Sequence, residues 1–138
     1  MKSTVRLIEN NRLEGSNSKG MKTYFDNNSG EYEQTAPTPM EILLQAVGSC
    51  SALDIISILK KQKREINDLV VDLDSDRRED YPKIFTNIRV KYSLTSSNAK
   101  ESELIRAIEL SQEKYCNVSI LMKNAGVNLT WECELKRP

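Results

Sequence analysis

The sequence predicts an α+β domain in which helices gather on one face of a mainly antiparallel sheet. Several short segments alternate apolar and polar residues, a pattern typical of half-buried strands. A long apolar segment with the start signals of a helix lies between them, and a second helical region precedes the last strand. A chain of 138 residues can bury one core, so we expect a single domain over residues 1–138.

The first strands are expected at residues 3–9 and 21–26, where the alternation is loose. We expect these two segments to pair antiparallel, joined by a long loop over residues 10–20. Residues 27–39 are polar and rich in turn-forming residues, and they are expected to form a loop that leads into a helix.

The long helix is predicted to begin after Thr38, a candidate N-cap. Pro39 suits the first helical position, and Glu41 at the third position completes the pattern of a capping box. We expect this helix to run to about Arg64. Most of its circumference is apolar, and one small domain has little left to cover it with. Either the sheet wraps around this helix or a second subunit covers it.

Alternation over residues 66–76 and 84–94 predicts two more half-buried strands. Residues 97–115 carry apolar side chains at helical spacing, and a shorter helix is expected at 116–126, ended by a glycine. Residues 127–135 alternate again and are predicted to close the sheet.

The charge balance makes some partners improbable. The 20 basic and 20 acidic residues cancel, and the only short basic run closes the long helix, where cations suit the helix dipole. We therefore expect no nucleic-acid partner. No segment has the uninterrupted apolar length of a membrane span, and the first residues do not resemble a signal peptide. We expect a cytoplasmic protein with no membrane segment.

Three cysteines are the reactive candidates, because the chain contains no histidine. The missing histidine removes Cys-His pairs and most zinc sites, and no nucleotide-binding motif occurs, so we expect neither a metal nor a cofactor. Cys133 alternates with Trp131 and is expected in the core. Cys116 lies where one helical pattern ends and another begins. It is either a thiolate favoured by a helix start or a buried thiol at a helix junction.

Cys50 lies in the middle of the long apolar helix, among apolar neighbours. Burial there would raise the pKa of a thiol and make it inert, so periodicity alone favours a core residue. Gly48 and the flanking Ser49 and Ser51 would let another chain or a ligand approach this thiol closely. Asp54, one turn later, is unexpected on a largely apolar face and would disfavour a thiolate.

These residues resemble the OsmC/Ohr family of osmotically inducible and organic hydroperoxide resistance proteins, over nearly the whole chain. The segment TPMEILLQAVGSC places Cys50 eleven positions after Pro39, as the family does, and the segment KYCNVSILM places Cys116 at the start of a helix. The sequence is most similar to the less characterised branch of OsmC-like proteins.

The resemblance implies an OsmC-like fold, in which antiparallel sheets wrap around long central helices in an intertwined homodimer. It also implies a cofactor-free thiol peroxidase. In that reading Cys50 attacks an organic hydroperoxide and becomes a sulfenic acid, which condenses with Cys116 to a disulfide. An external dithiol then reduces the disulfide.

The family's peroxidases hold an arginine against the reactive thiol with a glutamate, and Met40 stands at that position here. Glu41 follows it, on the opposite side of the helix from Cys50. Arg12 is the nearest candidate for the arginine by position. The replacement motivates an alternative, a non-catalytic OsmC-like dimer that binds a small hydrophobic ligand in a pocket at the dimer interface. A redox sensor acting through a partner is a third interpretation.

Overall fold

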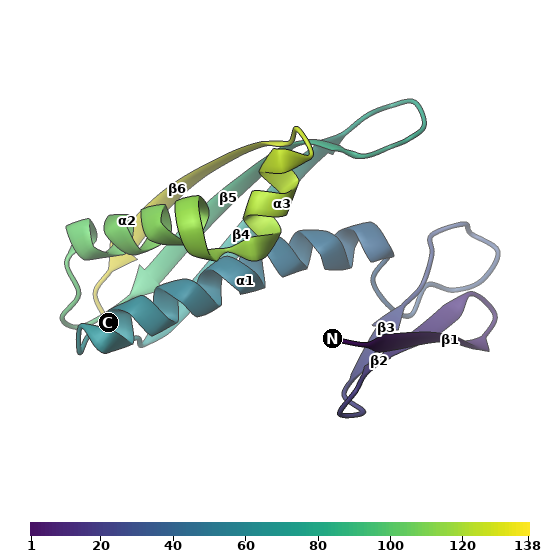
Figure 1. The fold of residues 1–138 in the computed structure, drawn as a ribbon, viewed down its shortest axis with the longest axis horizontal. Coiled ribbons are helices and arrows are strands. Elements are labelled where there is room, and N and C mark those ends of the chain that lie inside the picture. Colours follow the sequence, from purple (N-terminus) through teal and green to yellow (C-terminus); the bar gives the residue numbers. More distant parts are fainter. The chain divides into compact units, whose positions relative to one another are not determined.

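The computed structural model describes all 138 residues, which form two compact units, Met1–Leu44 and Gln45–Pro138 (Figure 1). Each unit contains a three-stranded sheet, and the chain has three α-helices, so the predicted α+β class is confirmed. The single domain over residues 1–138 stays a prediction.

The first unit contains an antiparallel sheet of three strands, in the order β1 (Ser3–Glu9), β2 (Arg12–Asn17) and β3 (Lys22–Phe25). Two predictions were wrong: the long loop over residues 10–20, and the direct pairing of residues 3–9 with residues 21–26. β2 fills most of the expected loop and pairs with both strands. This strand has one large apolar side chain, Leu13, so its sequence shows little alternation. Pairing on both edges satisfies its backbone instead.

Asp26 organises the loop that follows β3. Its carboxylate accepts hydrogen bonds from the backbone N–H groups of Thr35, at 2.9 Å, and Asn27, at 2.7 Å. The Asp26 N–H donates to the carbonyl of Pro37. The two bonds to the carboxylate lower the pKa of Asp26, the one from the Thr35 backbone most strongly. The Asp26 carboxylate and backbone therefore hold the two ends of this loop together just before the long helix begins.

The helix α1 (Pro39–Lys61) begins as predicted. The Thr38 Oγ1 accepts a hydrogen bond from the N–H of Glu41 at 3.3 Å, which confirms Thr38 as the N-cap. The helix ends three residues before Arg64, because Lys63 takes a left-handed conformation with φ of 57°. The Arg64 N–H then donates to the Leu59 carbonyl, as in a Schellman motif.

By length and composition alone, α1 could also cross a membrane. The core helix of a water-soluble protein passes the same test, so this property by itself is weak evidence for a membrane span.

The second unit contains the strands β4 (Asp68–Arg77), β5 (Phe85–Thr95) and β6 (Asn128–Lys136), in that order. β4 and β5 are antiparallel, but β6 runs parallel to β5, so this sheet is mixed. The expectation of a mainly antiparallel sheet did not include this crossover. The chain leaves β5, passes through the helices and returns to the same end of the sheet, which a parallel pair requires.

The crossover consists of α2 (Glu101–Leu110), a π-helix (Ser111–Tyr115) and α3 (Asn117–Asn124). Together with the second-unit part of α1, these helices cover one face of the β4–β5–β6 sheet (Figure 1). The helices therefore gather on one face, as the sequence predicts.

The core of the second unit lies between this helical layer and the sheet. Alternate residues of β5 point inward and are almost fully buried: Ile88, Val90, Tyr92 and Leu94. Gly48 brings α1 close to β4, because a Cβ atom added there would lie 2.6 Å from Leu73 Cδ1. Cys133, expected in the core, is only half-buried on β6.

Candidate active site

A π-helix positions the residue that the sequence places at a helix junction. The Cys116 N–H donates to the carbonyl of Ser111 at 2.7 Å, a bond between residues five apart. The sequence predicts one continuous helix over residues 97–115, whereas α2 ends at Leu110 and the π-turn follows. Single π-turns of this kind are often found at functional sites.

Cys116 is the N-cap of α3 and is fully buried. Its sulfur accepts a hydrogen bond from the Ser119 N–H at 3.4 Å and lies 3.0 Å from the Ser119 Oγ. The same sulfur lies 4.0 Å from the carbonyl oxygen of Val47, on α1. The predicted helix start at Cys116 is thus confirmed, and the thiol is also buried at a junction between elements.

Burial is the main influence on this thiol, and it raises the pKa of Cys116 above its ordinary value. The two hydrogen bonds with Ser119 act in the opposite direction and lower it, while the nearby Cys50 thiol raises it. One thiol influences the pKa of another only at short range. Cys50 and Cys116 therefore lie in the same neighbourhood of the second unit.

Cys50 is half-buried on α1, and all three cysteines are free thiols. It lies one turn after Val47, whose carbonyl approaches the Cys116 sulfur. Two reduced thiols thus lie in one neighbourhood, Cys50 on α1 and Cys116 at the start of α3. An arrangement of this kind suits thiol–disulfide chemistry, in which one sulfur is oxidised and the other attacks it.

A buried chain of hydrogen bonds lies beside these thiols and was missed in the sequence. The Gln112 Nε2 donates to the Tyr92 hydroxyl at 2.8 Å, and the Tyr92 hydroxyl donates to the Ser51 Oγ at 2.9 Å. Ser51 in turn donates to the carbonyls of Val47 and Gly48, both at 3.1 Å. Gln112 Oε1 is buried without a partner. The available signal in the sequence was a polar side chain at a position that the helix or strand pattern places inward, as at Ser51 and Tyr92.

Burial raises the pKa of Tyr92, so its hydroxyl stays protonated and remains a donor. The chain of bonds consequently has a fixed direction, from the π-helix through β5 to α1. It holds the π-helix, and with it Cys116, against the part of α1 that carries Cys50.

Asp54 has a structural partner that explains its place on an apolar face. The Ser111 Oγ donates to the Asp54 Oδ2 at 2.8 Å, which links α1 to the π-helix a second time. A hollow of about 380 Å³ opens beside this pair. Besides Asp54, the residues that line it are Ser57, Ile58, Lys61, Gln62, Leu110 and Tyr115.

The other two candidates, Arg12 and Glu41, belong to the first unit. The guanidinium of Arg12 lies over the Tyr24 ring, 4.8 Å from its centre, and the Arg12 Nε is buried without a hydrogen-bond partner. Glu41 contributes to the helix cap, since the Thr38 hydroxyl donates to its carboxylate at 3.2 Å. Catalytic roles for both residues stay predictions.

Comparison with known proteins agrees with the resemblance found in the sequence. A family model described as OsmC-like protein matches residues 30–132. The chain is 38% identical to protein YhfA of Escherichia coli, over 98% of both chains. A crystal structure of a hypothetical protein from Aquifex aeolicus is similar with a TM-score of 0.86 and 32% identity, covering 99% of this chain and 96% of that one.

A more distant likeness extends to the crystal structure of the organic hydroperoxide resistance protein OhrB of Bacillus subtilis. The TM-score is 0.63 at 18% identity, with 96% of each chain covered. At this identity the likeness concerns the fold.

Proposed function

Because the chain belongs to the family of OsmC-like proteins, we propose that it is a thiol peroxidase that reduces organic hydroperoxides. The observation that carries the proposal is a pair of free thiols, Cys50 and Cys116. The Cys116 sulfur lies 4.0 Å from the Val47 carbonyl, and Cys50 follows Val47 by one turn of α1. The family supports a redox role, and organic hydroperoxide resistance proteins share the fold. A reducing cytoplasm would keep these thiols free.

The proposed reaction has two steps within the protein. The Cys50 thiolate attacks the terminal peroxide oxygen, the O–O bond breaks, and the substrate leaves as an alcohol while Cys50 becomes a sulfenic acid. Cys116 then attacks the Cys50 sulfur, the S–O bond breaks, and water leaves as the disulfide forms. An external dithiol reduces the disulfide and closes the cycle.

We place the reaction in a homodimer. Only 28% of an 18-residue apolar stretch of α1 is buried within one chain, and the side chain of Leu53 is 67% exposed. On β1, Val5 and Leu7 share one face and are also exposed, at 59% and 61%. Exposed apolar side chains of this kind, present in each of the two units, favour a partner. A second copy of the chain would cover the long helix that one domain leaves open.

A second candidate function is the binding of a small hydrophobic ligand without catalysis. The observation in its favour is the burial of Cys116, which raises the pKa of that thiol and so opposes a reactive thiolate. This candidate predicts that the purified protein carries a stoichiometric ligand, detectable by native mass spectrometry, and consumes no peroxide.

The test is the consumption of cumene hydroperoxide with dithiothreitol as the reductant. We expect Cys50→Ser to abolish consumption, because the attacking sulfur is gone, and Cys116→Ser to slow turnover, because the sulfenic acid must wait for the reductant. Cys133→Ser is the matched control and should behave like the wild type, since this half-buried thiol takes no part. Undiminished consumption by Cys50→Ser would overturn the proposal.

A further inference from the structure

Ser119 directs two polar groups at the sulfur of Cys116. Its backbone N–H lies 3.4 Å from the Cys116 Sγ, and its side-chain Oγ lies 3.0 Å from the same atom. We infer that Ser119 is a positioning residue for the second step of the reaction, supporting Cys116 as a thiolate while it attacks oxidised Cys50. This inference rests on the proposed peroxidase function.

Helix capping accounts for the backbone contact but leaves the hydroxyl unexplained. Any acceptor at an N-cap takes the N–H of the third helical residue, here Ser119. The Ser119 side chain is fully buried, and its one hydrogen-bond partner is the Cys116 sulfur. A neutral thiol is a weak hydrogen-bond partner, so a buried hydroxyl gains little from it. A sulfur that becomes charged is a much stronger acceptor.

A hydroxyl can serve both protonation states of the thiol. The Ser119 Oγ can accept the hydrogen of the neutral Cys116 thiol, and after a rotation of its O–H bond it can donate to the thiolate. In the second step the proton that leaves Cys116 ends in the water formed from the sulfenic hydroxyl. The S–S bond forms as the S–O bond breaks, so atoms and charges balance with no further reactant.

The surroundings of the Cys116 sulfur disfavour a thiolate, so a hydrogen bond from Ser119 to the thiolate matters for the second step. Burial raises the pKa of Cys116, and the Val47 carbonyl 4.0 Å away also disfavours a negative charge. Charged groups on the elements that carry the two thiols have other partners: Asp54 on α1 accepts from Ser111, and the Lys123 ammonium on α3 donates to the Gln112 carbonyl. The N–H that donates to the sulfur, and the hydroxyl that accepts from the thiol and could donate to a thiolate, both come from Ser119.

The experiment follows single turnover of the reduced protein with one equivalent of cumene hydroperoxide. Quenched samples are read by mass spectrometry for dimedone-trapped Cys50 sulfenic acid and for the Cys50–Cys116 disulfide. In Ser119→Ala we expect Cys50 to be oxidised at the wild-type rate. The disulfide should form about ten- to a hundredfold more slowly, the range for losing a hydrogen bond to a charged group. The sulfenic acid should accumulate.

Ser96→Ala is the matched control. Ser96 is also fully buried and its hydroxyl is also hydrogen-bonded, but it accepts from the N–H groups of Asn98 and Ala99 rather than from a thiol. Its disulfide should form at the wild-type rate. Should Ser119→Ala fail to fold, Ser119→Thr and Ser119→Val form a second pair of nearly equal shape. The threonine variant should form the disulfide faster than the valine variant.

Equal disulfide rates in Ser119→Ala and the wild type, or in the threonine and valine variants, would overturn the inference. The inference would also be overturned if Ser96→Ala slowed disulfide formation as much as Ser119→Ala, because both variants would then act by loosening the core in general. A wild-type protein whose Cys50 is never oxidised would instead contradict the proposed function itself, so the two failures are distinguishable.

Discussion

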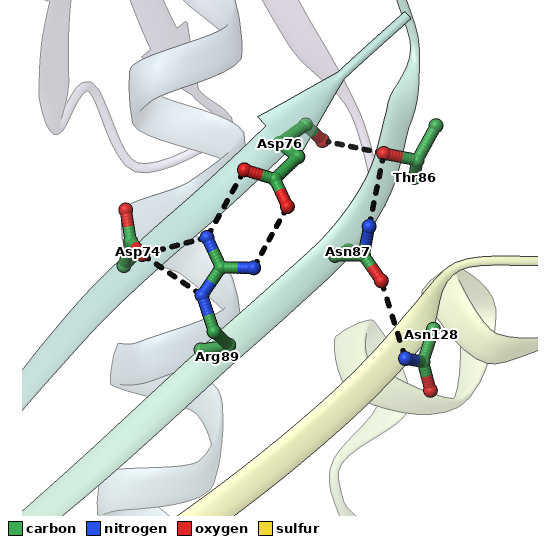
Figure 2. A network of polar contacts seen from close by, with 6 residues as sticks. All are labelled: Asp74, Asp76, Thr86, Asn87, Arg89 and Asn128. Atoms are coloured by element: carbon green, nitrogen blue, oxygen red, sulfur yellow. Dashed lines mark hydrogen bonds and ion pairs between the residues drawn. The ribbon is translucent and has the colours of Figure 1, made fainter.

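The two faces of the β4–β5–β6 sheet carry polar networks of opposite kinds. On the outer face, the guanidinium of Arg89 donates to the carboxylates of Asp74 and Asp76 over distances of 2.6–3.1 Å (Figure 2). On the inner face, the neutral Tyr92 hydroxyl lies between Gln112 and Ser51, and all three side chains are buried.

The difference between the faces is access to water. The outer charges are substantially exposed, 43% for the Arg89 side chain and 75% for Asp74, so water and salt can replace their interactions. The polar row continues across the sheet through Thr86, Asn87 and Asn128, again in contact with solvent (Figure 2). Buried hydroxyl and amide groups have no such replacement, so each broken bond leaves an unsatisfied group.

Removing the Tyr92 hydroxyl should have the largest effect on stability. In Tyr92→Phe the Gln112 Nε2 loses its acceptor inside the core, while Ser51 keeps its bonds to the carbonyls of Val47 and Gly48. We expect the free energy of unfolding to fall by about 1–3 kcal/mol. Urea unfolding followed by circular dichroism measures it.

Gln112→Leu sharpens this prediction, because it removes both the amide donor and the unpartnered Gln112 Oε1. In the Gln112→Leu background, Tyr92→Phe should lower the free energy of unfolding by less than it does in the wild type. We expect a coupling of about 0.5–3 kcal/mol between the two sites. Additive effects of the two substitutions would mean that the inner network does not act as a unit.

Arg89→Met on the outer face should have a smaller effect than Tyr92→Phe. The exposed ion pairs it removes are screened, so the loss should shrink further when salt is added. The measurement is urea unfolding at low and high ionic strength. A loss as large as that of Tyr92→Phe and independent of salt would contradict the comparison of the faces.

The same variant has a defined response to acid. The hydrogen bond from Arg89 is the largest cause that holds the pKa of Asp76 below its ordinary 3.8. A lowered pKa in the folded state contributes stability at pH values above the ordinary pKa, and this is lost as the pH falls through the folded value. The difference in the free energy of unfolding between the wild type and Arg89→Met, measured by urea unfolding, should therefore narrow as the pH falls below 3.8.

Local signals in the sequence were sufficient for several features. The Thr38 cap, the start of α1 and the strands β4 and β5 follow from capping chemistry and from alternation over a few residues. The proposed redox pairing of Cys50 with Cys116 came from the resemblance to a family and stays a prediction. Periodicity alone favoured a core residue at Cys50.

The features that could not be predicted depend on contacts between distant segments. The polar strand β2 is stable because it pairs on both edges, and β6 runs parallel to β5 because of the crossover before it. The π-helix shifts the register by one residue and leaves no mark in the apolar spacing. The bond from Gln112 to Tyr92 joins residues whose neighbourhood exists only in the fold.

The central claim is that Cys50 and Cys116 form a redox pair, and the most direct test is to map the disulfides of the oxidised protein. The reduced wild type is treated with one equivalent of cumene hydroperoxide, digested without reduction and analysed by mass spectrometry. The account predicts one new cross-linked peptide pair, joining Cys50 to Cys116, with Cys133 still free. Oxidation that leaves both thiols unlinked, or that joins either of them to Cys133, would contradict it.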